Sequence, residues 1–189
     1  MSRELLQRGP LQRSPGMRPS TWFLWHAHRI RAGERVLDLA CGDGRHSIAA
    51  AALGAQVVAI DRDPVKLANN GRARAAFAGL TIDWRELDLE EEWPELEPFD
   101  AVLVFNYLDR ASMPRILGLV APGGLLIMET FLEAQREAGW GPTSSAHLLR
   151  PGELSHLVAP LKVVHGREVL ETVDDEHWRA VASVIAVKK

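Results

Sequence analysis

Three aspartates have the chemistry to hold a ligand that carries a positive charge and a ribose. Asp38 lies inside an apolar segment, Asp61 ends the next one and Asp88 follows a third. An unpaired carboxylate inside an apolar strand is costly, so Asp38 needs a backbone donor, a water or a cationic ligand. An acidic side chain at the end of the second strand can accept both hydroxyls of a ribose. Structural interpretations stay open: a local turn bond for Asp38, helix capping near Asp61, and a solvated surface for Asp88.

A glycine turn lies in "VLDLACGDGRHSIA", residues 36–49. Gly42 and Gly44 allow a sharp turn and let a ligand approach the backbone closely. The turn lacks the lysine of a nucleotide phosphate loop, and it fits a dinucleotide fingerprint poorly because Ser47 stands in place of the third glycine. Alone, the turn is equally well explained as an ordinary strand-to-helix connection. Together with acidic residues at three successive strand ends, it indicates a site for a cationic nucleoside without a pyrophosphate.

Segments of strand and helix pattern alternate along the chain. Continuous apolar runs predict strands at 35–40, 56–61, 80–87, 99–106 and 123–131. Capping residues and apolar spacing predict helices at 20–33, 45–54, 63–79, 112–120 and 150–160. Two further strands, 162–173 and 177–189, are separated only by "DDE", which allows an antiparallel hairpin but no crossover helix. The predicted fold class is α/β: a doubly wound, mostly parallel seven-stranded sheet with an antiparallel C-terminal hairpin.

Length and composition favour one domain. The chain has 189 residues, of which 47% are hydrophobic and 25% are charged, enough for one buried core and short for two. Residues 1–19 contain four arginines and three prolines and are predicted to be a flexible arm, with a single domain at 20–189. A net charge of −3 gives no general reason to bind nucleic acid, so a nucleic-acid partner is disfavoured.

Cysteine and histidine usage exclude several kinds of site. The single cysteine, Cys41, cannot form an internal disulfide, which favours a reducing, cytoplasmic setting. No cluster has zinc-ligand spacing, and His26 and His28 have no partner cluster, so no metal is expected. No apolar run approaches the roughly 20 residues needed to span a bilayer, so we expect no membrane contact. We expect a monomer or a homodimer.

Over about residues 22–131, the sequence resembles the class I S-adenosylmethionine-dependent methyltransferases. The family's first motif reads hydrophobic-hydrophobic-Asp-x-Gly-x-Gly-x-Gly, and "VLDLACGDGRH" matches it with Ala40 for the first glycine and His46 for the last. The "GRH" ending and the segment 128–154 are similar to a branch near the tellurite-resistance-type and related small-molecule methyltransferases. The resemblance implies a Rossmann-like methyltransferase fold that binds S-adenosylmethionine and methylates a small-molecule acceptor by direct in-line displacement.

The resemblance also implies which residues bind the cofactor. From the first motif they are Asp38, Ala40, Cys41, Gly42 and Gly44. Backbone groups of this turn would approach the methionine moiety, and the carbonyl of Phe105 would meet its amino group. Asp61 would hold the ribose diol, and Arg62 would flank the adenine. Asp88 would accept a hydrogen bond from the adenine amino group while Leu89 packs on the ring.

The acceptor side is expected to follow the fourth strand. Asn106 and Tyr107 would face the methyl group, with Tyr107 orienting an acceptor, shielding the sulfonium or forming one pocket wall. His147 is a candidate general base or substrate ligand, or else a hydrogen-bonded loop histidine. Tyr107 and His147 are thus the catalytic candidates. Because alignment of the acceptor behind the methyl group is the main catalytic device expected, no catalytic triad is needed.

Other candidates come from neighbouring segments. Glu129, Arg150 and Gln135 would lie on segments over the acceptor side, where Glu129 either touches the substrate or pairs with Arg150. Trp22 either packs in the first helix or belongs to a helix that covers the site. Two other functions stay open: a regulator or degenerate enzyme that binds S-adenosylmethionine without transfer, and a nicotinamide-dependent oxidoreductase. The poor fingerprint and the terminal hairpin argue against the second.

Overall fold

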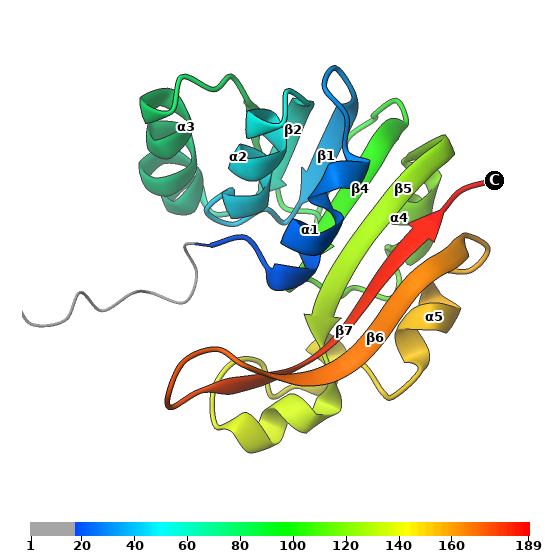
Figure 1. Cartoon of the computed structure of the whole chain (residues 1–189). Coiled ribbons are helices and arrows are strands. Elements are labelled where there is room, and N and C mark those ends of the chain that lie inside the picture. Colours follow the sequence, from blue (N-terminus) through cyan, green and yellow to red (C-terminus); the bar gives the residue numbers. More distant parts are fainter. Residues whose placement is uncertain (1–17) are drawn as a thin grey trace, which may run out of the picture.

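A computed structural model describes residues 18–189, which form one seven-stranded sheet (Figure 1). The strand order is β3-β2-β1-β4-β5-β7-β6. The strands are β1 (Arg35–Leu39), β2 (Gln56–Asp61), β3 (Asp83–Glu86), β4 (Phe99–Phe105), β5 (Val120–Phe131), β6 (Lys162–Thr172) and β7 (Trp178–Val187). Strands β1 to β5 pair in parallel, whereas β7 is antiparallel to β5 and β6. The predicted fold class, including the C-terminal hairpin, is confirmed.

Helices cover both faces of the sheet, with α1, α2 and α3 on one face and α4 and α5 on the other (Figure 1). The α-helices are α1 (Thr21–His26), α2 (Arg45–Ala52), α3 (Ala73–Phe77), α4 (Met113–Gly118) and α5 (Glu153–Leu157). The other helical segments are the 3-10 segments η2 (Ala27–Arg29), η4 (Glu133–Ala138) and η5 (Ser145–His147) and the π-helical η3 (Lys66–Arg72). The connections from β1 to β2, from β2 to β3 and from β4 to β5 each include a helix that returns the chain to the start of the next parallel strand.

Alternate residues of the central strand β4 belong to two different cores. Ala101 and Leu103 pack with α1 and α2, whereas Val102 and Val104 pack with α4 and α5. Side chains alternate between the faces of a strand, so a strand covered on both faces must be apolar throughout. This is the physical reason for the unbroken apolar runs that predicted the sheet.

Two predicted helix starts are confirmed by their capping bonds. The Oγ of Ser20 accepts the N–H of Phe23 at 3.0 Å, and Oδ1 of Asp63 accepts the N–H groups of Val65 and Lys66. The first helix is shorter than predicted, because α1 passes into the 3-10 turn η2 after His26. Residues 1–17, which hold most of the predicted arm, lie outside the described residues, and the boundaries of the arm and the domain stay predictions.

The ring of Trp84 in β3 lies against two glycines, Gly44 and Gly71, where a side chain would overlap it. A Cβ on Gly44 would lie 2.2 Å from the Trp84 ring, and a Cβ on Gly71 would lie 2.7 Å from it. Trp84 thus packs the N-terminus of α2 and the π-helical turn against the sheet.

None of the helices in residues 18–189 has the length and the apolar composition that a membrane-spanning helix needs.

Replacing Gly44 by alanine is expected to destabilise the protein more than replacing Gly42. Both residues have positive φ, +69° and +59°, so both alanines incur about 1–2 kcal/mol of left-handed strain. Only the Cβ at position 44 meets another group, because nothing lies within 4 Å of a Cβ at position 42. Overpacking against Trp84 should add about 1–3 kcal/mol. Urea unfolding of the two variants measures the difference, and equal free energies of unfolding would contradict this packing role.

Candidate cofactor and acceptor site

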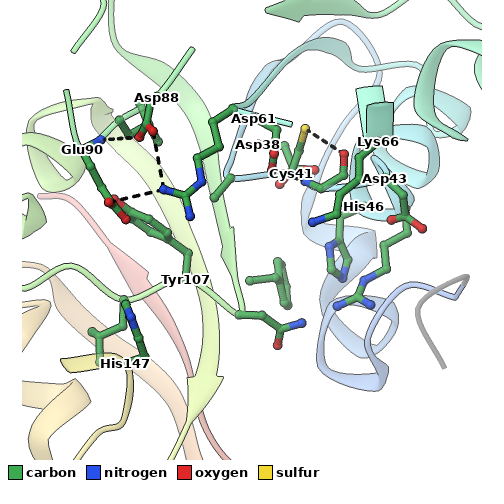
Figure 2. A pocket seen from close by; sticks show the side chains of 18 of the residues that line it. Asp38, Cys41, Asp43, His46, Asp61, Lys66, Asp88, Glu90, Tyr107 and His147 are labelled. Carbon is green, nitrogen blue, oxygen red and sulfur yellow. Dashed lines mark hydrogen bonds and ion pairs between the residues drawn. The ribbon is translucent and has the colours of Figure 1, made fainter. Parts of the chain in front are cut away.

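A pocket of about 620 Å³ opens at the carboxyl ends of the central strands. Strand order reverses between β1 and β4, and ligands of doubly wound sheets bind at such a reversal. The pocket volume lies within the usual range for small-molecule sites. Residues that follow β1, β2, β3 and β4 line it together (Figure 2).

Two residues with left-handed backbone conformations mark the pocket. Ala40, directly after β1, has φ +52°, and Asn106, directly after β4, has φ +57°. Both line the pocket. The N–H of Asn106 donates to the carbonyl of Glu129 at 2.9 Å, which helps to fix its conformation. Backbone strain of this kind is concentrated at functional sites, and it explains why the related motif has a glycine where this chain has Ala40.

Asp38 is a buried acid with one unpaired oxygen. Its side chain is 1% exposed, Oδ2 accepts the hydroxyl of Ser47 at 2.5 Å, and Oδ1 is buried without a hydrogen-bond partner among the described residues. Burial raises the pKa of this carboxyl to about 7, against the opposing effect of the Ser47 hydrogen bond. Since Asp38 also lines the pocket, a cationic ligand there would stabilise its charged form.

Asp61 joins the end of β2 to the turn after β1. Its Oδ2 accepts the N–H of Gly42 at 2.6 Å, and its Oδ1 accepts the N–H of Asp63 at 2.9 Å. These bonds hold the carboxylate in one orientation in the pocket. Each carboxylate oxygen has a further lone pair, so both can also accept a ligand hydroxyl.

Arg62 spans the ends of β2 and β3 on the pocket rim. Its Nη1 lies 3.5 Å from Oδ2 of Asp88 and 3.3 Å from Oε2 of Glu90 (Figure 2). Glu90 first, and then Asp88, raise the pKa of the guanidinium. Leu89, next to these acids, is 6% exposed and lines the pocket. An apolar surface beside carboxylate acceptors suits an amino-bearing aromatic ring.

His46 stands where the related motif has a glycine, and it joins α1 to the pocket. Its Nε2 accepts the N–H of Ser20 at 3.0 Å, and its ring stacks on Phe105 at 3.8 Å between centroids. Burial holds the pKa of His46 well below its usual value. The imidazole is therefore neutral at physiological pH, as an acceptor at Nε2 requires. The departure from the motif was visible in the sequence, but its role was not.

Cys41 and Phe105 both line the pocket, as predicted. Cys41 is 7% exposed, and burial raises the pKa of its thiol. The thiol is therefore protonated and unreactive at neutral pH. Phe105 is 5% exposed and ends β4, which places its backbone beside the turn after β1.

The two catalytic candidates have different environments. Burial, and then the nearby carboxylates of Asp109, Glu90 and Asp88, raise the pKa of Tyr107 to about 12. The phenol stays protonated at neutral pH, so it suits a hydrogen-bond donor or a pocket wall and not a base. His147 is exposed and also lines the pocket. Figure 2 shows both on the side opposite Asp38 and Asp61.

Gly44 and Trp22 are not among the pocket-lining residues, although the sequence predicts both at the site. Gly44 precedes α2 and accommodates the Trp84 ring. Trp22 is 4% exposed, and its Nε1 donates to the carbonyl of Val184 at 3.3 Å. Of the interpretations of Trp22, helix packing therefore fits the structure.

Glu129 is likewise not in the pocket wall. It is fully buried, with Arg167 at 3.2 Å, Arg179 at 3.0 Å and the hydroxyl of Ser183 at 2.8 Å. Its predicted pairing with Arg150 is wrong. Its actual partners come from the C-terminal hairpin, whose register against Glu129 is set by long-range pairing and cannot be read from the local pattern.

Arg150 and Gln135 do not line the pocket either. Arg150 is exposed and its backbone N–H donates to Glu153 at 2.8 Å. Gln135 is fully buried, accepts the N–H of Ala180 at 2.9 Å and donates to the carbonyl of Trp140 at 2.9 Å. Gln135 thus holds the segment that precedes His147 against β7.

The pocket has further lining residues that the sequence did not single out as ligands. They are Asp43, Arg45, His46, Lys66, Leu87, Glu90, Leu108, Phe131 and Pro142. The first three follow directly from the glycine motif, so their position in it was a usable signal. Phe131 and Pro142 carried none, because only the fold brings them to the end of β4.

Comparison with known proteins agrees with this geometry. Residues 36–124 match the model of the methyltransferase domain family. Over these residues the chain is similar to methyltransferase domains. The predicted resemblance to the class I S-adenosylmethionine-dependent methyltransferases is confirmed, and S-adenosylmethionine is the cofactor that this domain implies. Among the residues described, no group of three or more His, Cys, Asp or Glu is arranged to hold a metal ion.

Individual relatives match this chain over part of its length and over part of their own. A protein-L-isoaspartate O-methyltransferase of Methylorubrum populi is 35% identical over 135 residues, 64% of this chain and 63% of the relative. A ubiquinone biosynthesis O-methyltransferase of Methylocella silvestris is 34% identical over 153 residues, 71% of this chain and 59% of the relative. The chain thus spans about 60% of these relatives' length. The structure of TehB from Haemophilus influenzae has the same fold, with a TM-score of 0.72, 18% identity, and coverage of 88% of this chain and 61% of that one.

The residues of this domain fit the cofactor chemically. The buried, unpaired Oδ1 of Asp38 suits the positive charges of its methionine end. The fixed carboxylate of Asp61 suits a ribose diol. A Cβ on Gly42 would point into open space, so the backbone is accessible to a ligand there.

Binding of S-adenosylmethionine is expected to strengthen as pH rises from about 5.5 to 8. Below its raised pKa of about 7, free Asp38 is protonated, and a bound cation favours the carboxylate, so binding releases a proton. Each unit by which the ligand lowers that pKa strengthens binding about tenfold. His46 does not titrate in this range, since its pKa lies well below 6.5. Calorimetry in two buffers of different ionisation heat measures the proton release.

Asp38→Asn is the matched control for this pH dependence. The amide retains the shape and the hydrogen bond to Ser47 but cannot ionise, so its affinity should be weaker and flat across the same pH range. Proton release of equal size in the variant would contradict the assignment to Asp38.

Proposed function

We propose that the protein transfers the methyl group of S-adenosylmethionine to a small-molecule acceptor. The observation that carries the proposal is the pocket at the strand-order reversal, which gathers Asp38, Asp61 and Asp88 at one edge of the sheet. The methionine end would lie against the turn after β1, with the Phe105 carbonyl near its amino group. The ribose would lie on Asp61, and the adenine between Arg62, Asp88 and Leu89.

The cofactor, when bound, supplies an activated methyl group. The protein's part is then to align an acceptor behind that group and to exclude water. Ideal alignment lowers the reaction barrier by on the order of 7–11 kcal/mol. Asn106, Phe131 and Pro142 would form the acceptor wall. Their apolar and amide surfaces suit a small, largely apolar molecule with one polar reacting group.

His147 is the better candidate for a general base. It lines the pocket and is exposed, so it can exchange a proton with solvent. Tyr107, whose pKa is about 12, would instead form the wall beside the adenine end. An acceptor hydroxyl must lose a proton during methylation and gains from such a base. The two relatives are named as O-methyltransferases, so oxygen acceptors come first in a test.

Asp61→Asn is expected to weaken S-adenosylmethionine binding at least tenfold. The amide cannot accept from both a ribose diol and the N–H groups of Gly42 and Asp63, and a lost charge-assisted hydrogen bond is worth roughly 1.5–3 kcal/mol. Asp83→Asn is the control, because Asp83 begins β3 and pairs only with Arg85 in its salt bridge. Calorimetric titration measures both, and unchanged affinity in the Asp61 variant would overturn the cofactor site.

Transfer itself is tested with cofactor carrying a labelled methyl group and a panel of phenols, carboxylates, thiols, amines and chalcogen oxyanions. The proposal expects label in at least one small acceptor and a loss of about 100-fold in rate for His147→Ala with a hydroxyl acceptor. Binding without transfer to any acceptor would favour the regulator or degenerate enzyme. A cytoplasmic location and a monomer or homodimer stay predictions.

A further inference from the structure

Arg110 connects the two segments that carry the acceptor side of the pocket. It follows β4, three positions after Tyr107, and does not line the pocket itself. Its Nη1 donates to the carbonyls of Ser145 at 3.4 Å and Ala146 at 3.0 Å, and its Nη2 donates to the carbonyl of Leu148 at 2.8 Å. These three carbonyls surround His147 in the chain.

The rest of the guanidinium binds Glu153 at the start of α5. Nε donates to Oε1 at 2.6 Å, and Nη2 donates to Oε2 at 2.9 Å. The backbone N–H of Arg150 donates to the same Oε2 at 2.8 Å. These hydrogen bonds lower the pKa of Glu153 to about 2, and the bond from Arg110 has the largest effect. A planar fork with five N–H groups makes such a set of bonds, whereas the ammonium group of lysine cannot.

Within the described residues, the hydrogen bonds that connect residues 107–113 to residues 142–149 all have Arg110 as their donor. Within its own segment, the 3-10 turn η5 has one side-chain cap, the Oγ of Ser144, which accepts the N–H of Ala146 at 3.3 Å. Just beyond the turn, Leu149 is held to the end of β5, because its N–H donates to the carbonyl of Phe131 and its carbonyl accepts the N–H of Glu133, both at 2.9 Å. Arg110 supplies the hydrogen bonds that place residues 145–148 relative to the end of β4.

We propose that Arg110 is a positioning residue, which sets the distance between the His147 turn and the end of β4 and thereby the width of the acceptor side. The inference rests on the proposed function, because it assigns His147 to the acceptor. Arg110 touches neither cofactor nor acceptor. It acts through the backbone of residues 145–148 and through Glu153.

Arg110→Lys is the test variant, and Arg136→Lys is its matched control. Arg136 also donates to a backbone carbonyl near this turn, that of Thr143 at 2.9 Å, but with one bond only. Hydrogen exchange of the amides of residues 145–148, measured with S-adenosylhomocysteine present, reports directly on the turn. We expect exchange to speed up at least tenfold in the Arg110 variant and to stay unchanged in the Arg136 variant.

The same variants distinguish a specific effect on the position of the His147 turn from a general destabilisation of the pocket. Arg110→Lys should leave the affinity for S-adenosylhomocysteine within twofold and lower kcat for an acceptor found by the labelled-methyl panel by about 10- to 100-fold. Glu153→Gln, which keeps the carbonyl contacts, should lie between wild type and Arg110→Lys in both readouts.

Unchanged exchange at 145–148 in Arg110→Lys, or an equal effect of Arg136→Lys, would overturn the proposal. So would a loss of S-adenosylhomocysteine affinity as large as the loss of transfer rate. If the wild type methylates no acceptor, the proposed function fails, while hydrogen exchange still decides whether Arg110 holds the turn.

Discussion

The hydrogen bond from the Gly42 N–H to the Asp61 carboxylate, 2.6 Å long, is the contact on which the arrangement of the pocket depends. It fixes the turn after β1 against the end of β2 and at the same time orients the acid that faces the ligand. The left-handed Ala40 begins the same turn. Without this contact, the turn after β1 and the Asp61 carboxylate would no longer be held in a fixed position relative to each other. The cofactor subsite would then not be preformed.

Several energetically costly features of the described residues lie in the pocket wall. Asp38 is buried with an unpaired oxygen, and Ala40 and Asn106 adopt strained backbone angles. Elsewhere, buried charges such as Glu129 are paired. Penalties of this kind at a pocket are offset when the pocket binds a complementary ligand. The buried, unpaired oxygen of Asp38 therefore favours a cationic ligand already in the free protein.

The fold and the gathering of Asp38, Asp61 and Asp88 in one pocket could be predicted because both depend on short stretches of sequence. Apolar runs specify the parallel strands. Asp38 lies near the end of the first strand, Asp61 ends the second and Asp88 follows the third. Gly44 shows the limit: its need for glycine comes from Trp84, which only the folded sheet brings near. The acceptor half depended on long-range contacts, and Arg110, whose partners include three backbone carbonyls, leaves no pattern in a single sequence.

The orientation of the cofactor tests the account most directly. A crystal structure with bound S-adenosylhomocysteine should show both ribose hydroxyls on the Asp61 carboxylate, the methionine amino group towards Asp38 and the Phe105 carbonyl, and the sulfur facing the space between Asn106 and His147. A nucleoside bound in the reverse direction, or bound outside this pocket, would contradict the account.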